Sequence, residues 1–156
     1  EYATTLRLDK LDDYFDPEKH DFFDQLIENF SRKIIFDLEH PVYSGFLFNV
    51  LNERNNKEPG DLNIHTKKWL LNLTTEIIRK YIAAGKLNPL VDPEIAAFMI
   101  VEIQINVFDY LVIKYNMDFS GNIRKKQPVM AVKRDEIMSI IKKVTFILKN
   151  GLKPTI

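Results

Sequence analysis

Residues 92–116 read DPEIAAFMIVEIQINVFDYLVIKYN and give the clearest indication of the fold. Asp92 is placed to cap a helix, Pro93 suits the first helical position, and Glu94 suits the positive end of the helix dipole. No stop signal precedes Asn116, so the pattern predicts about 24 residues of helix. A helix that is apolar on most sides must be covered on most sides. This segment is therefore expected at the centre of the fold.

The rest of the chain shows the same helical spacing of apolar residues, interrupted by turn signals. Asp16 and Pro17 are expected to open one helix, His40-Pro41 to end it, and Gly85 to end a later one. The basic stretch from Ser120 to Val132 is expected to be a loop. No β-hairpin signal competes, so we predict an all-α antiparallel bundle of about six helices, over 1–14, 17–39, 42–54, 61–84, 93–116 and 134–150.

Length and composition limit the classes of protein that are compatible with this sequence. The 156 residues are expected to form a single domain, 1–156, which is large enough to bury an apolar core without disulfides or metal ions. There is no cysteine, which excludes disulfides and thiolate zinc sites and fits a cytoplasmic protein. Lys+Arg and Asp+Glu balance at 22 each, so the net charge gives no reason to expect nucleic acid. We expect no membrane partner.

The central helix has two unlike faces when each residue is set about 100° further round the axis. Glu102, Asn106 and Asp109 form a polar stripe on one face, and apolar side chains flank it: Phe98, Met99, Ile105 and Ile113. The other face is almost wholly apolar, with one amide: Ala97, Ile100, Gln104, Phe108, Leu111 and Tyr115. One face is expected inside the chain and the other against a second copy, and the sequence does not decide which is which.

The polar stripe has three interpretations: solvent exposure, a polar contact between copies, or a binding cavity with a few placed polar groups. A similar mixed stripe on the preceding helix, formed by Trp69, Asn72, Leu73 and Glu76, favours the cavity. In the last helix, Phe146 stands among Lys142, Lys143 and Lys149. It is either an interface residue or a lone exposed aromatic.

Catalytic and metal-binding constellations are not found in the sequence. Its three histidines form no paired Glu-x-x-His motif, and there is no phosphate-binding loop, Gly-x-Ser-x-Gly or His-Glu-x-x-His. We therefore expect no enzyme activity, no metal and no cofactor. The basic residues of 122–134 lack interleaved aromatics for base stacking, so we interpret that stretch as a solvated loop.

Three segments resemble the C-terminal effector-binding and dimerisation domain of TetR-family transcriptional regulators. They are EHPVYSGFL (39–47), AAGKLNPLVDPEIAAFM (83–99) and ILKNGL (147–152). The resemblance spans residues 8–152 in helix order and length. It implies that the last two long helices, 93–116 and 134–150, pair with their copies in a four-helix homodimer bundle. It also implies a ligand pocket walled by the helices at 17–39, 42–54, 61–84 and 93–116.

The family's N-terminal helix-turn-helix is absent from this chain, and residues 1–14 are expected to be the remainder of the helix that links to it. The resemblance therefore implies the ligand-sensing part of a DNA-binding repressor or activator. Its effector would be small and largely apolar, with a polar or cationic group. The alternative is a structural helical interaction module without a cavity.

We expect the following residues to bind the ligand: Phe30, Ile34, Phe46, Trp69, Asn72, Leu73, Phe98, Glu102, Ile105 and Asn106. We expect the dimer interface to contain Gln104, Phe108, Leu111, Tyr115, Val144, Phe146 and Ile147.

Overall fold

The computed structural model describes residues 15–52, 62–129 and 133–152. The described residues contain helices and no strand, which confirms the all-α prediction. The predicted helix at 1–14 lies outside them. Within the described ranges six helices follow one another: α2 (Phe22–Glu39), α3 (Pro41–Asn52), α4 (Leu62–Ala83), α5 (Pro93–Tyr115), α6 (Phe119–Arg124) and α7 (Arg134–Leu152).

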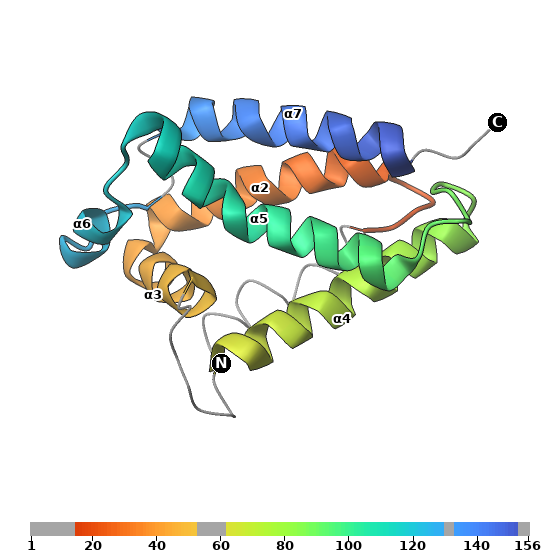
Figure 1. Ribbon diagram of the computed structural model, residues 1–156, viewed down its shortest axis with the longest axis horizontal. Helices are drawn as coiled ribbons and strands as arrows, with labels where there is room; N and C mark the ends of the chain where they lie inside the picture. The colour runs from red at the N-terminus through yellow and green to blue at the C-terminus, as the bar shows by residue number, and fades with distance from the viewer. Residues whose placement is uncertain (1–14, 53–61, 130–132, 153–156) are drawn as a thin grey trace.

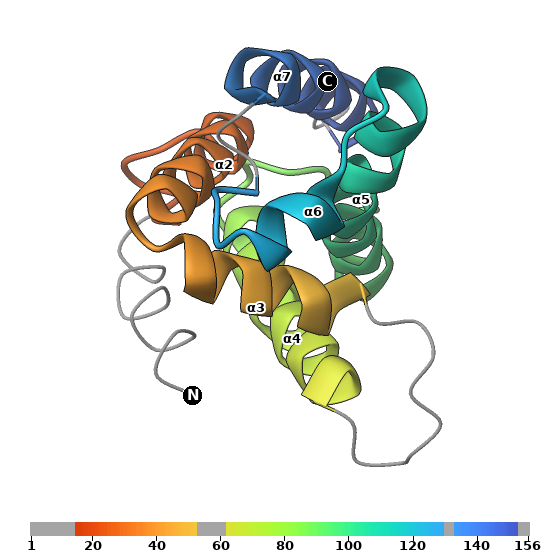
Figure 2. The same cartoon turned by 90° about the vertical axis from the view of Figure 1, so that its left-hand side faces the viewer.

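The long helices lie in two packed pairs. α4 packs against α5, and α2 packs against α7 (Figure 1). The shorter α3 contacts α2, α4 and α6, and with α6 it closes one end of the bundle (Figure 2). α5 therefore crosses the whole bundle between α4 on one side and the α2–α7 pair on the other.

Capping side chains set where the helices begin. α5 starts as predicted, because the Asp92 carboxylate accepts the N–H groups of Glu94 and Ile95 and Pro93 follows it. α2 starts later than predicted. Residues 17–19 form a turn in which Asp16 accepts the Glu18 N–H and pairs with Lys19. Asp21 is the N-cap of α2, so the prediction of a helix opening at Asp16-Pro17 is wrong by about one turn.

Three predicted helix ends are confirmed. His40 ends α2 directly before Pro41, with its N–H donated to the Phe36 carbonyl. Gly85 follows α4 in the left-handed conformation, at φ 68°, and Asn116 ends α5 in the same region at φ 51°. The last helix was predicted over 134–150, and α7 continues beyond that range to Leu152.

The segment predicted as the loop 120–132 contains the short helix α6. The Asp118 carboxylate accepts the Gly121 N–H and so caps α6. A Cβ on residue 121 would collide with that carboxylate, so the absence of a side chain at Gly121 makes the cap possible. Gly121 suggested a loop from the sequence, but α6 requires a glycine at this position.

The apolar core has two parts. At the α4–α5 junction end, buried side chains of α2, α4 and α5 pack together with Leu148 of α7, among them Phe22, Ile78, Tyr81 and Ile100. At the other end, Phe30 and Ile34 of α2 pack with side chains of α5, α6 and α7, among them Leu111, Phe119 and Ile137. α5 contributes to both parts, so the fold depends on it along its whole length.

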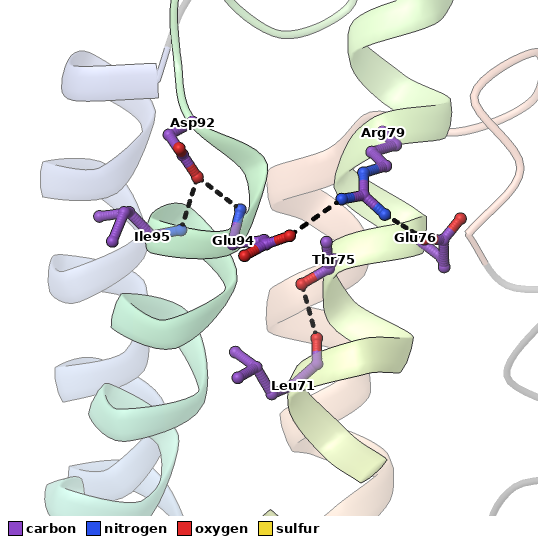
Figure 3. A network of polar contacts seen from close by, with 7 residues as sticks. All are labelled: Leu71, Thr75, Glu76, Arg79, Asp92, Glu94 and Ile95. Carbon is purple, nitrogen blue, oxygen red and sulfur yellow. Dashed lines mark hydrogen bonds and ion pairs between the residues drawn. The ribbon is translucent and has the colours of Figure 1, made fainter. Parts of the chain in front are cut away.

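A polar network fixes α4 against the start of α5 (Figure 3). Arg79 of α4 pairs with Glu76 on its own helix and, 3.2 Å away, with Glu94 of α5. One turn below, the Thr75 hydroxyl donates to the Leu71 carbonyl at 2.8 Å and so buries no unpaired polar atom. Since the Arg79 pairs are exposed, they orient the helices more than they stabilise them.

Among the described residues, α5 is the one helix long and apolar enough to cross a membrane. Core helices of folded domains meet the same criterion. One side of α5 packs into both parts of the core, which is the position of such a core helix.

Tyr81 carries a buried hydroxyl for which no hydrogen-bond partner lies among the described residues. Its ring stacks edge-on against Phe22 at 5.2 Å between ring centres. Burial raises the pKa of Tyr81 from 10.0 to about 12, with a smaller contribution from the carboxylates of Asp16 and Asp21. The buried hydroxyl therefore lowers the free energy of unfolding at neutral pH. It lowers that free energy further at a pH where Tyr81 of the unfolded chain ionises.

We expect Tyr81→Phe to raise the free energy of unfolding by about 1 kcal/mol at pH 7, because it removes an unpaired buried hydroxyl. A raised pKa in the folded state means that the wild type loses stability as the pH rises from 10 toward 12. The difference in free energy of unfolding between Tyr81→Phe and the wild type, measured by urea unfolding, should therefore increase over that pH range. Tyr110→Phe, at an exposed tyrosine, is the control and should not raise the free energy of unfolding at pH 7. A loss of stability in Tyr81→Phe at pH 7 would contradict this account.

Candidate functional site

The inward side of α5 faces α2. At the middle of α5, Gln104 is half-buried, and its amide oxygen accepts a hydrogen bond from Lys33 Nζ of α2 at 2.7 Å. On the same side Ala97 and Leu111 have no exposed surface. The face that is apolar except for one amide is therefore the face that packs inside the chain.

The opposite side of α5 is the outward face, and it is mostly apolar. Its exposed side chains are Ile95, Phe98, Met99, Tyr110 and Ile113, with Ile113 the most exposed at 84%. Asn106 is exposed and Glu102 half-buried on the same face. A face with this many large exposed apolar groups on one helix is typical of a surface that another molecule covers.

α7 adds to this exposed apolar surface. Lys149 Nζ lies 3.9 Å from the carboxylate of Asp21, the N-cap of α2, so the side of α7 that carries Lys149 faces α2. Ile147 lies about 160° round the helix from Lys149 and so turns away from α2. Ile147 and Phe146 are 69% and 67% exposed. Phe146 points in a different direction from Ile147, nearer to the lysines.

A compact polar group lies at the middle of the outward face. The Asn106 side-chain amide donates to the Glu102 backbone carbonyl at 2.8 Å and to its carboxylate at 3.0 Å. Lys67 Nζ of α4 lies 3.9 Å from the same carboxylate. The negative charge of Glu102 is thus shared between an amide and an ammonium, and the three groups form one unit on the surface.

A second polar pair joins α2 to α5, and both of its side chains are half-buried. Lys33 Nζ lies 4.7 Å from the centre of the Phe30 ring and donates to Gln104. Other apolar side chains of α3 and α5 are buried: Leu47, Val50, Val101 and Ile105. The buried Asn63 of α4 donates its amide to the Val50 carbonyl and so ties α4 to α3.

The predicted ligand-binding residues are divided between the interior and the surface. Phe30, Ile34 and Ile105 are buried, and Leu73 is half-buried. Phe46, Trp69, Asn72, Phe98 and Asn106 are exposed, and Glu102 is half-buried on the outward face. The structure therefore does not bring the ten residues into one site, and their role toward a ligand stays a prediction.

The predicted interface residues are also divided, and two of them need correction. Leu111 has no exposed surface and packs in the core with Ile34 and Ile137, and Gln104 faces α2. Both were assigned to an interface because the sequence did not show which face of α5 turns inward. Tyr115, Phe146 and Ile147 are exposed, and Val144 is half-buried. The side chain of Phe108 lies outside the described residues.

Two buried or half-buried polar residues were not predicted. Lys33 of α2 meets a residue 71 positions away, a pairing that no local pattern signals. Asp37 has no exposed surface, and its carboxylate accepts the Val129 N–H at 2.8 Å. An acid on the apolar stripe of a helix is the one local signal in the sequence that points to Asp37.

No group of three or more His, Cys, Asp or Glu side chains that could hold a metal ion occurs within the described ranges.

Comparison with known proteins identifies the fold. No protein-family model matches the chain, and no curated protein matches its sequence. Among solved structures, the chain is similar to a TetR family transcriptional regulator from Chloroflexus aurantiacus J-10-FL, with a TM-score of 0.63 and 18% sequence identity. The alignment covers 97% of this chain and 70% of that one. The predicted TetR-like fold is thereby confirmed.

Proposed function

We propose that this chain is the ligand-sensing and dimerising part of a TetR-type transcriptional regulator of the cytoplasm. In this proposal DNA is bound by a further domain, to which residues 1–14 connect, and the present chain is regulatory and has no catalytic role. The observation that carries the proposal is a TetR-like fold whose α5 presents a long apolar face outward. A structural interaction module without a ligand is the alternative.

The homodimer would form through the outward face of α5 together with α7. This assignment exchanges the two faces of α5 relative to the one expected from sequence. Ile95, Met99 and Ile113 of α5 replace Gln104 and Leu111 as interface residues, and Ile147 and Phe146 of α7 remain. Because so many apolar side chains are exposed on these two helices, a monomer would tend to associate.

The effector would bind in the interior bounded by α2, α3, α4 and α5. Phe30, Ile34 and Ile105, which are buried side chains of α2 and α5, would supply apolar contacts to it. Lys33 and Gln104 form a half-buried polar pair between α2 and α5, so we assign the polar end of the effector to them. A lysine ammonium favours a carboxylate or another hydrogen-bond acceptor, in place of the cationic group that Glu102 would have met.

Ligand binding would couple to DNA binding through two states of the chain. An effector that contacts α2 in only one state biases the placement of α2, and through it that of the proposed DNA-binding domain. The spacing of two DNA-binding domains in a dimer depends on that placement, and half-site recognition depends on the spacing.

Native mass spectrometry of the purified chain tests the proposal. We expect twice the mass of the 18.3 kDa chain, and additional mass wherever an effector is retained from the expression host. A compound at about 100 times its dissociation constant should stabilise the fold by ~2.7 kcal/mol. Lys33→Met should abolish the shift for a compound with a carboxylate while leaving the fold intact.

Ile113→Glu serves as the interface variant in the same experiment, because it places a charge at the most exposed apolar residue of the outward face. We expect a monomer from it. Val42→Glu, a matched change at an exposed residue of α3, should remain a dimer. A monomeric wild type would refute the dimer. A dimer with no saturable shift for any compound would favour the structural module.

A further inference from the structure

The short helix α6 is held closely against α3 at one end of the bundle (Figure 2). Gly45 of α3 permits this approach, because a Cβ at residue 45 would lie 3.3 Å from the side chain of Ile123. The ring of Phe119 packs against that of Phe48 with 5.2 Å between ring centres. Together with the Asp118 cap at its N-terminus, these contacts fix the position of α6.

The C-terminal end of α6 is closed by two backbone hydrogen bonds. Lys126 donates its N–H to the Ile123 carbonyl at 3.0 Å, and Gln127 donates its N–H to the Asn122 carbonyl at 2.9 Å. This pattern is a Schellman motif, in which the residue after the C-cap takes the left-handed conformation. Lys126 occupies that position at φ 55°. The turn that follows α6 is therefore as well defined as the helix.

Lysine is an unusual residue at this position of the motif. Glycine is the ordinary choice, because a side chain strains the left-handed backbone. The chain follows that rule after α4, where the same two hydrogen bonds are made by Gly85, at φ 68°, and Lys86. A residue that keeps its side chain at a strained position indicates that the side chain serves a purpose other than folding.

Lys126 is the last of three consecutive basic residues, Arg124–Lys126, which we call the basic turn. All three side chains are exposed, and no ion pair of theirs occurs within the described part of the chain. The sequence has no acid between Asp118 and Asp135, and the Asp118 carboxylate caps the opposite end of α6. The helix dipole favours cations here, but for an exposed charge this gain is smaller than the cost of the left-handed backbone.

The surroundings of the basic turn decide which anionic partner fits it. Residues 116–129 are all described, and none of them exposes a large apolar side chain that could enter a lipid layer. They also expose no aromatic ring on which an unpaired base could stack. Basic side chains on a fixed turn, without apolar neighbours, match the phosphates of duplex DNA.

We propose that the basic turn contacts the phosphate backbone of duplex DNA. This inference rests on the regulator proposed above, and it adds a contact by the present chain to the one made by the further domain. The balanced overall charge does not oppose it, because the excess of positive charge is local. Such a contact carries no base sequence information and strengthens binding through the release of counterions.

An NMR titration of the purified chain with a short DNA duplex, starting at about 20 mM salt, tests the contact. We expect the largest amide shifts at residues 122–127. Replacing all three basic residues, by Arg124→Ser, Lys125→Ser and Lys126→Ser, should lower the magnitude of the slope of log affinity against log salt. The expected change is about 0.9 for each lost phosphate contact.

The matched control removes three positive charges from exposed positions elsewhere in the chain, by Lys86→Ser, Lys142→Ser and Lys143→Ser. It should keep the shifts at residues 122–127 and most of the slope. Equal weakening in the two triple variants would overturn the assignment, because the binding would then follow net charge alone. An unshifted 122–127 segment at the lowest salt would also overturn it.

Lys126→Gly separates the fold from the contact, because its two expected effects have opposite signs. Glycine relieves the strained backbone, so the urea midpoint should rise, while the lost charge should lower the magnitude of the salt slope by about 0.9. Lys126→Arg should keep the slope of the wild type and should not raise the midpoint. If Lys126→Gly bound the duplex as the wild type does, Lys126 would not contact phosphate.

A second probe distinguishes DNA from a lipid surface. Vesicles of phosphatidylcholine with phosphatidylglycerol should bind the chain more weakly than the duplex, and the reverse order would overturn the choice of partner. The triple variant of the basic turn should keep the mass of the dimer and the response to an effector. A failure of the DNA contact would therefore leave the proposed function standing, and a monomeric wild type would refute the dimer without removing the shifts at residues 122–127.

Discussion

Leu111→Ala lowers the free energy of unfolding of the chain by about 2–5 kcal/mol, the range for truncating a buried leucine. Leu111 has no exposed surface and packs with side chains of α2 and α7, so its loss leaves a cavity that close-packed neighbours fill only in part. The measurement is urea unfolding at a protein concentration where the chain is monomeric and again at one where it is dimeric. The loss should be the same at both concentrations.

Ile113→Ala is the matched control, two residues further along the same helix and 84% exposed. In the monomer it should change stability by no more than about 0.5 kcal/mol, as surface substitutions do. If Leu111→Ala behaved like Ile113→Ala in the monomer and lost stability only where the dimer forms, Leu111 would lie between copies. The inward orientation of this face of α5 would then be wrong.

The sequence predicted most of the fold because the signals for it are local. Asp92 and Pro93 start α5, Pro41 separates α2 from α3, and Gly85 ends α4, each through its own backbone chemistry. The failures are also local, where two signals compete. Asp16-Pro17 and Asp21 both suit a helix start, and which one caps the helix depends on packing that a single segment does not contain.

The orientation of α5 was not predictable in the same way. Both of its faces are apolar enough to be buried, so periodicity gives no preference. The decision rests on contacts between distant segments, such as Lys33 with Gln104 and Ile34 with Leu111. For that reason three residues predicted for a ligand, Phe98, Glu102 and Asn106, lie on the outward face of α5, whereas Gln104 and Leu111, predicted for the interface, lie on the inward one.

Asp37→Ala is expected to lower the free energy of unfolding by about 2–4 kcal/mol, although it removes a charge from the core. The Asp37 carboxylate, at the C-terminal end of α2, accepts the buried Val129 N–H of the segment that follows α6. Removing the acceptor leaves that N–H without water and without this partner, and loosens the connection that leads into α7. The measurement is chemical denaturation of both proteins at pH 7.

Two further variants separate this hydrogen bond from a general effect of charge. Asp37→Asn keeps a carbonyl oxygen that can accept the Val129 N–H, so it should recover part of the loss. Glu28→Ala removes an acid from the same helix, where Glu28 forms an exposed pair with Arg32, and should cost no more than about 0.5 kcal/mol. If Asp37→Ala were as mild as Glu28→Ala, the link between α2 and Val129 would not contribute to stability.

Because α2 also carries Lys33, the same link would hold α2 in place around the proposed effector. Asp37→Ala should therefore weaken effector binding as well as the fold, whereas Glu28→Ala should leave both unchanged.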